Sequence, residues 1–184
     1  GKPFIWKQVE PKSQPSCEWT TSSYQATPPV KGWCELETSR VAPSVARAGA
    51  TAIAYNTENV PAEDVASLNV FIDPKYQGRT SLPDSADDTW ALAYLATGVT
   101  DWTKVTDEQL AAAADWLRKA HQNVAAYWAD PAEQAQLMAS GAVDVAWSWN
   151  DGVVLLENDG FPVGFQRSAK EGSSTFFCGF VKLK

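Results

Sequence analysis

From residue 51 onward, short apolar runs alternate with longer segments in which apolar residues recur every three or four positions. The short runs are rich in Val, Ala, Phe and Trp and are typical of strands, whereas the longer pattern is typical of helices with one buried face. Strands are predicted over residues 51–55, 79–83, 123–128, 142–149, 161–166 and 175–182. Helices are predicted between them, over residues 85–97, 106–120, 130–141 and 150–160.

Residues that favour helix ends support these boundaries. Thr106 and Gln109 fit a capping box, in which each side chain satisfies the other's backbone N–H. Asp130 and Asn150 stand where an N-cap is expected, and Gly98 follows a helix where a left-handed backbone is favoured. Because strands alternate with helices, we predict an α/β fold, a three-layer αβα sheet that is largely parallel.

Residues 1–50 have a different character from the rest of the chain. They hold six of the eleven prolines and show little periodicity, so we predict an irregular N-terminal segment with a short helix over residues 41–49. Residues 51–184 form the predicted α/β lobe. Cys17 and Cys34 are predicted to form a disulfide if the protein is exported, and Cys178 lies in an apolar run and is predicted to be a buried thiol.

Composition excludes several classes of function. The net charge is −7, which disfavours a nucleic-acid partner, and no apolar run approaches the roughly 18 residues that span a bilayer. No signal peptide is visible in the chain. The single histidine, His121, and the lack of Cys-x-x-Cys, glycine-rich phosphate and Gly-x-Ser-x-Gly motifs predict no metal, no cofactor and no catalytic residue.

Acidic and aromatic residues collect where three predicted strands end. Asp84, Ser85 and Asp88 follow the first of these strands, Trp128 ends the second and Trp149 ends the third. The carboxyl ends of parallel strands meet at one edge of an open sheet, where ligands bind. Carboxylates and aromatic faces together suit an organic ammonium ion, because the carboxylates balance its charge and the rings attract it.

Each of these residues also has a structural explanation. An oxygen-bearing side chain at a helix start serves as an N-cap, which applies to Asp84, Ser85, Asp130 and Asn150. Asp88 could face water in a first turn, and Trp149 could belong either to the core or to a pocket. The pattern alone leaves these alternatives open.

Several stretches from Thr51 onward are similar to spermidine/putrescine-binding proteins, the solute-binding components of ABC transporters. The matching stretches are residues 52–56, 73–79, 82–84, 141–150 and 171–172. The resemblance implies the type II periplasmic binding protein fold, in which two α/β lobes clamp a ligand between them. Only the second lobe is matched.

The resemblance also implies which residues bind. The family's acidic positions fall on Ser85 and Asp88, its tryptophan before Asn falls on Trp149, and a further aromatic and acidic pair falls on Phe176 and Cys178. A serine and a cysteine therefore stand where carboxylates are expected, which implies a smaller or different cation than spermidine.

Together these observations predict binding of a small, polyamine-like organic cation by a truncated solute-binding lobe, without a chemical step. The resemblance implies an ABC-transporter permease as partner and a periplasmic or extracellular location. Surface that a second lobe would cover predicts a homo-oligomer. The alternative is a structural or interaction module that has lost transport function, and a third reading is a hydrolase acting through the cluster of Asp84, Asp87 and Asp88.

Overall fold

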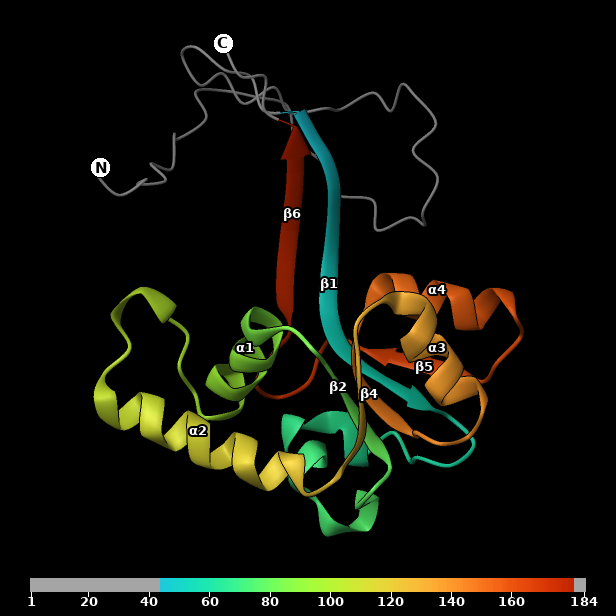
Figure 1. The fold of residues 1–184 in the computed structure, drawn as a ribbon, viewed down its shortest axis with the longest axis horizontal. Coiled ribbons are helices and arrows are strands. Elements are labelled where there is room, and N and C mark those ends of the chain that lie inside the picture. The colour runs from blue at the N-terminus through green and yellow to red at the C-terminus, as the bar shows by residue number, and fades with distance from the viewer. Residues whose placement is uncertain (1–43, 181–184) are drawn as a thin grey trace. The chain divides into compact units, whose positions relative to one another are not determined.

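The computed structural model describes residues 44–180, and within them six strands form one sheet (Figure 1). The strand order is β3-β2-β4-β1-β5, and β6 also pairs with β1. The strands are β1 (Ser44–Asn56), β2 (Thr80–Pro83), β3 (Val124–Trp128), β4 (Val145–Trp149), β5 (Val163–Gln166) and β6 (Ser174–Phe180).

The sheet is mixed. Strand β2 runs parallel to β3 and to β4, as predicted, but β1 is antiparallel to both β4 and β5. In the β1–β4 ladder Thr51 lies opposite Trp149, so the middle of β1 lies beside the carboxyl end of β4. The prediction of parallel strands is therefore right for three neighbours and wrong for β1.

The helices lie within about two residues of their predicted bounds. They are α1 (Ala86–Ala96), α2 (Asp107–His121), α3 (Pro131–Ala139) and α4 (Asn150–Asn158). At the start of α2 the Thr106 hydroxyl accepts from the Gln109 N–H at 3.3 Å, and the Gln109 side chain accepts from the Thr106 N–H at 3.0 Å. At the start of α3 the Asp130 carboxylate accepts from two backbone N–H groups, at 2.8 and 2.9 Å.

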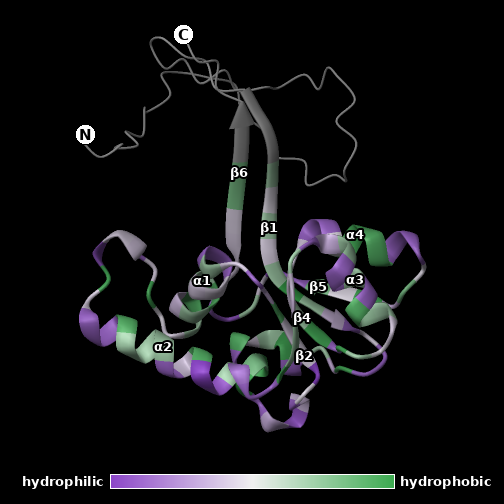
Figure 2. Cartoon of the chain, in the orientation of Figure 1, coloured by the Kyte–Doolittle hydropathy of each residue, from purple (hydrophilic) through white to green (hydrophobic). Residues whose placement is uncertain are grey.

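Helices cover both faces of the sheet, which confirms the three-layer α/β architecture (Figure 1). Successive strand residues point to opposite faces, so Ile53 packs with the core under α1 and α2, while Ala54 packs with the core under α3 and α4. Short 3-10 turns over residues 64–76 complete the first core. In Figure 2 hydrophobic residues alternate with strongly hydrophilic ones along α2, as its one buried face requires.

Two local predictions are wrong. Residues 44–49 belong to strand β1 and not to a helix, because membership of a strand that pairs with β6 overrides the local helix preference. Asn150 begins α4 but does not cap it with its side chain, which instead accepts from the Ala50 N–H at 3.0 Å.

Some predictions fall outside the described part of the chain. This applies to the irregular structure of residues 1–43, to the disulfide between Cys17 and Cys34, and to the burial of the Cys178 side chain. The compact unit Val45–Cys178 holds the sheet and helices described above, and the other unit consists of Gly1–Ser44 and Gly179–Lys184. Among the described helices, all are too short or too polar to cross a membrane.

Candidate functional site

The Asp88 carboxylate lies in the first turn of α1, beside the carboxyl end of β4 and the middle of β1. The Trp149 indole N–H donates to its Oδ2 at 3.3 Å, and the Thr51 hydroxyl donates to its Oδ1 at 3.4 Å. Both bonds are long, and both donors are neutral. Asp88 is half-buried, so its orientation is restrained while part of the carboxylate stays accessible.

The turn between β2 and α1 holds the other two polar residues predicted for the site. Ser85 is the N-cap of α1, and its hydroxyl accepts from the Asp88 N–H at 3.4 Å. The Asp84 N–H donates to the Trp128 carbonyl at 2.8 Å, which joins this turn to the end of β3, while the Asp84 side chain is exposed. Ser85, and not Asp84, therefore caps the helix.

Three aromatic side chains form a cluster beside Asp88. Trp128 and Trp149 meet edge to face, with ring centroids 5.0 Å apart and planes at 87°. Trp149 also lies 6.5 Å from Phe176 at 60°. Trp128 is buried, whereas Trp149 and Phe176 are half-buried. The structure thus brings the predicted residues Asp88, Trp128, Trp149 and Phe176 together, with Ser85 and Asp84 at their margin.

Strand β1 contributes residues to this region that the sequence did not predict. Besides Thr51, Ala50 contributes its N–H, which donates to the Asn150 side chain. Gly49 contributes by lacking a side chain, because an added Cβ would overlap the Phe176 ring and the Asn150 side chain. These residues escape a sequence-based search because a parallel β1 would carry residues 49–51 away from the edge. An expectation of antiparallel pairing with β4 would have found them.

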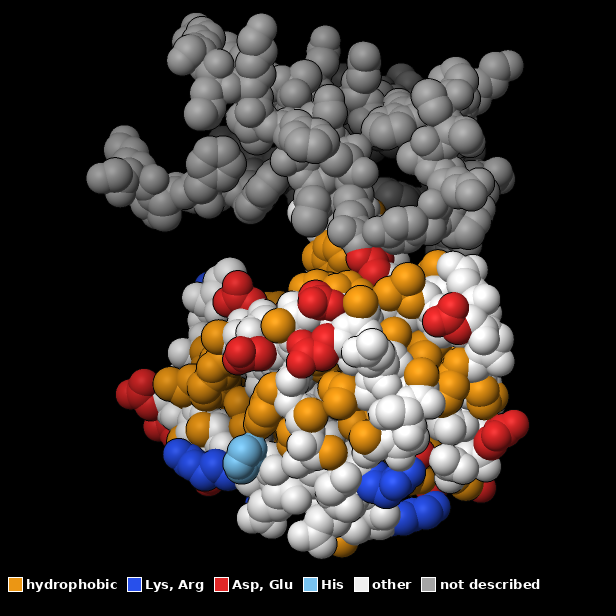
Figure 3. Space-filling view, turned by 45° about the vertical axis from the view of Figure 1, so that its right-hand side comes forward, with side chains coloured by type: hydrophobic (Ala, Val, Ile, Leu, Met, Phe, Trp, Pro, Cys, Tyr) orange, Lys and Arg blue, Asp and Glu red, His pale blue; other side chains and the backbone are white. Residues whose placement is uncertain are grey.

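The charge of Asp88 is not balanced by an ion pair among residues 48–177, the range whose side chains the structure describes. Its two side-chain partners, Trp149 and Thr51, are both uncharged. In Figure 3 several acidic side chains lie among hydrophobic ones on one part of the surface, while Lys, Arg and His side chains lie lower in the view. Such a surface favours cations over anions.

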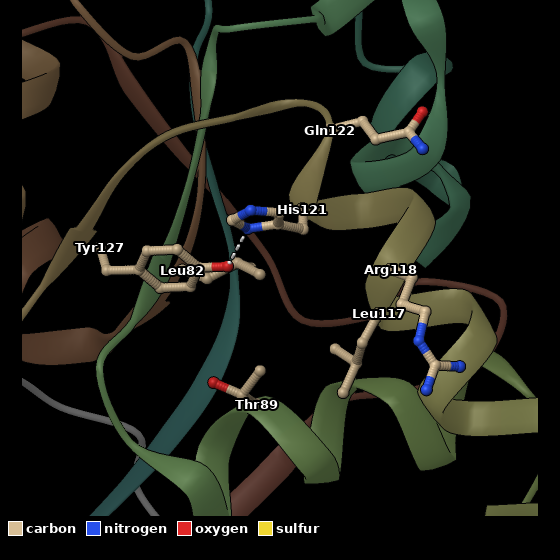
Figure 4. A pocket seen from close by; sticks show the side chains of 7 residues that line it. All are labelled: Leu82, Thr89, Leu117, Arg118, His121, Gln122 and Tyr127. Carbon is tan, nitrogen blue, oxygen red and sulfur yellow. Dashed lines mark hydrogen bonds between the residues drawn. The ribbon is translucent and has the colours of Figure 1, made fainter. Parts of the chain in front are cut away.

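A shallow cavity of about 460 Å³ lies elsewhere, between α1, α2 and strands β2 and β3 (Figure 4). It is lined by Leu82, Thr89, Leu117, Arg118, His121, Gln122 and Tyr127. None of these belongs to the aromatic cluster, and Tyr127 precedes Trp128 in β3, so the two side chains point to opposite faces. The cavity is therefore distinct from the candidate site.

Metal binding has no support in the described residues. Nowhere in the part of the chain that the structure describes do three His, Cys, Asp or Glu side chains come close enough to hold an ion. What the Asp88 region offers is one oriented carboxylate and three aromatic rings. That set can hold a cationic solute by charge, hydrogen bonds and ring contacts.

Comparison with known families identifies the class of protein that this fold and site represent. Residues 41–180 match the family described as bacterial extracellular solute-binding protein. The match covers well over half of the chain, so the chain belongs to this family. The family is one of transporter solute-binding proteins and not a class of enzymes. A search of curated protein sequences finds no match.

Solved structures agree with this assignment. A protein of Listeria monocytogenes assigned to spermidine/putrescine ABC transport is 25% identical, with a TM-score of 0.65 over 74% of this chain and 41% of its own. The spermidine/putrescine ABC transporter substrate-binding protein PotD of Streptococcus pneumoniae is 21% identical, with a TM-score of 0.63 over 76% and 41%. The glucopine-bound binding protein MotA of A. tumefaciens is 24% identical, with a TM-score of 0.61 over 77% and 45%.

These likenesses confirm the predicted resemblance to polyamine-binding proteins and its restriction to one lobe. The chain spans less than half the length of these similar structures. Their bound or named solutes differ, since one is associated with spermidine and putrescine and another with glucopine. The fold alone therefore does not specify the solute.

Proposed function

We propose that this chain binds a small organic cation at the site formed by Asp88, Trp149, Trp128 and Phe176. The observation that carries the proposal is the Asp88 carboxylate, which is held by the Trp149 indole within an aromatic cluster and has no ion-pair partner among residues 48–177. A carboxylate in such a place is best balanced by a charge that arrives with the ligand.

The physical basis is the pairing of charge with aromatic surface. An ammonium group would donate hydrogen bonds to Asp88, while the rings of Trp149 and Phe176 would cover its methylene groups. A cation close to an aromatic face gains roughly 0.5–2 kcal/mol, more where water is excluded. Asp84 and Ser85 lie at the turn beside Asp88 and would contact a longer solute.

The biological setting of the proposal follows from the family. A polyamine-like solute is supported by the spermidine/putrescine proteins among the similar structures, and delivery to an ABC-transporter permease outside the cytoplasm is supported by the family description. One lobe supplies one wall of a clamp, so we expect weak binding by this chain alone. Self-association stays a prediction, which light scattering coupled to size exclusion would measure.

Isothermal titration calorimetry with putrescine, spermidine and choline tests the proposed function. We expect saturable binding of at least one of these cations and roughly tenfold weaker binding by Asp88→Asn, because a charge-assisted hydrogen bond is lost. Asp87→Asn is the matched control, since Asp87 is the adjacent acidic residue on α1 and is exposed. It should bind as the wild type does.

Two results would contradict the proposal. One is the absence of binding heat for all three cations at millimolar concentration. The other is an equal loss of affinity in Asp88→Asn and Asp87→Asn, which would indicate a general charge effect. If Asp88→Asn and Trp149→Ala both change nothing except stability, the chain acts as a structural or interaction module instead.

A further inference from the structure

Thr51 and Trp149 act on Asp88 as a pair. They lie directly opposite each other in the β1–β4 ladder, and each donates to a different oxygen of the same carboxylate. One donor comes from β1 and the other from β4, while the acceptor comes from α1. The carboxylate is therefore held from two strands at once.

Burial makes Thr51 suited to this task. The residue is 1% exposed, so water does not compete for its hydroxyl, and a β-branched side chain has few χ1 positions within a strand. An ionised carboxylate offers about four acceptor directions. Thr51 and Trp149 use two of them without neutralising the charge, which leaves the remaining directions to N–H donors of a solute.

We propose that Thr51 is a positioning residue for solute binding, which orients the Asp88 carboxylate toward the head group of a cation. The proposal rests on the proposed function and adds a residue of β1 to it. Without the Thr51 hydroxyl, the carboxylate keeps its charge and its bond from Trp149 but loses one of its two restraints. Directional hydrogen bonds to a primary ammonium group should then weaken.

The test compares putrescine affinity across variants by calorimetry. Thr51→Val keeps the shape of the side chain and removes the donor, and we expect roughly three- to tenfold weaker binding. Thr51→Ser restores the hydroxyl and should bind within about twofold of the wild type. In the Asp88→Asn background, Thr51→Val should have no further effect, because the two residues act through one contact.

Thr80→Val is the matched control. Thr80 is likewise a fully buried strand threonine, and its hydroxyl has no hydrogen-bond partner in the described residues. The same substitution there should leave putrescine affinity unchanged, and urea titration of every variant shows whether it is folded. If the role of Thr51 is purely structural, Thr51→Val should lower stability, and Thr51→Ser should not restore putrescine affinity.

The outcomes separate the two proposals. Wild-type affinity in Thr51→Val, together with weakened binding in Asp88→Asn, overturns the role of Thr51 and leaves the proposed function intact. Additive losses in the double variant also overturn it. If the wild-type protein binds none of putrescine, spermidine and choline, both proposals are overturned.

Discussion

Two carboxylates lie at opposite ends of the parallel strands and differ in how their charge is balanced. Asp88 follows β2 and accepts from two neutral donors. Asp144 precedes β4, is buried, pairs with Arg79 and accepts from the Asn59 amide at 2.9 Å. Its backbone is also fixed, because its N–H donates to the Arg79 carbonyl. The amino edge of the sheet is thus closed by a satisfied charge network.

The pKa of Asp144 indicates that its charged form stabilises the fold. Burial raises the pKa of its carboxyl, but the hydrogen bonds from Arg79 and Asn59 and the charge of Arg79 outweigh burial and hold the pKa below its ordinary value. The buried carboxylate at the amino edge is thus compensated by an arginine and an amide. At the carboxyl edge, Asp88 accepts from two neutral donors and has no ion-pair partner among residues 48–177, which fits the proposed binding of a cation.

The largest effect that tests this contrast is on stability. Asp144→Asn should lower the free energy of unfolding by about 2 kcal/mol, less than for a fully buried pair because Arg79 is half-exposed. Asp88→Asn should lower it by no more than about 0.5 kcal/mol. Urea denaturation measures both, and Asp115→Asn, which removes an exposed ion pair on α2, is the control. A larger loss in Asp88→Asn than in Asp144→Asn would reverse the comparison.

The contrast should also depend on pH. The folded pKa of Asp144 is depressed, so its contribution is fully present above the unfolded value, ordinarily 3.8, and is lost as pH falls through the folded pKa. The stability difference between wild type and Asp144→Asn should therefore be constant from pH 7 to 5 and shrink below about pH 4. Urea titrations at pH 7, 5, 4 and 3 measure it. A difference that stays constant down to pH 3 would show that the Arg79 pair contributes little.

Sequence patterns predicted the local features of this fold better than its pairing. Capping at Thr106 and Asp130 is decided by side chains within three residues, so it can be recognised in the sequence. The direction of β1 depends on distant partners, and alternation of apolar residues carries no direction. The strand over residues 44–49 was missed for the same reason, since only its neighbours override its helix-favouring alanines.

In the candidate site, too, the sequence predicts the residues at strand ends but not those that depend on strand pairing. Trp128 and Trp149 end strands and Asp88 follows one, and the edge of a parallel sheet gathers such positions, so their proximity could be expected. Thr51 could not be found this way, because its place at the site depends on the antiparallel ladder with β4. The prediction that Asn150 caps its own helix is also wrong, since its side-chain oxygen accepts from the Ala50 N–H of β1.

Gly49→Ala tests the contribution of β1 to the candidate site. The added methyl group would overlap the Phe176 ring and the Asn150 side chain, so these side chains must shift, and the contact of Phe176 with Trp149 would be disturbed. We expect stability to fall by about 1 kcal/mol and putrescine affinity to fall roughly two- to fivefold. Urea denaturation and calorimetry measure these changes. Gly78→Ala, at a turn with open space but a positive φ of 69°, is the control that should affect stability alone.

The smallest effect is expected at the cavity beside α2. Tyr127 and His121 share a hydrogen bond of 2.8 Å between the phenol oxygen and Nδ1, and their rings stack (Figure 4). The pKa of a tyrosine hydroxyl is ordinarily 10.0 and burial raises that of Tyr127 further, so the hydroxyl is protonated at neutral pH. Because Tyr127 is 41% exposed, water can replace the lost partner in Tyr127→Phe, and stability should change by less than about 0.5 kcal/mol.

Putrescine affinity should not change at all in Tyr127→Phe, because Tyr127 points away from the face of β3 that carries Trp128. Calorimetry of Tyr127→Phe and Trp128→Phe compares the putrescine affinities of variants at two adjacent residues. Trp128 contacts Trp149 edge to face, so replacing Trp128 should weaken putrescine binding, whereas replacing Tyr127 should not. Weaker putrescine binding in Tyr127→Phe than in Trp128→Phe would place the solute in the cavity of Leu82, His121 and Tyr127, and the contrast between Asp88 and Asp144 would then concern stability alone.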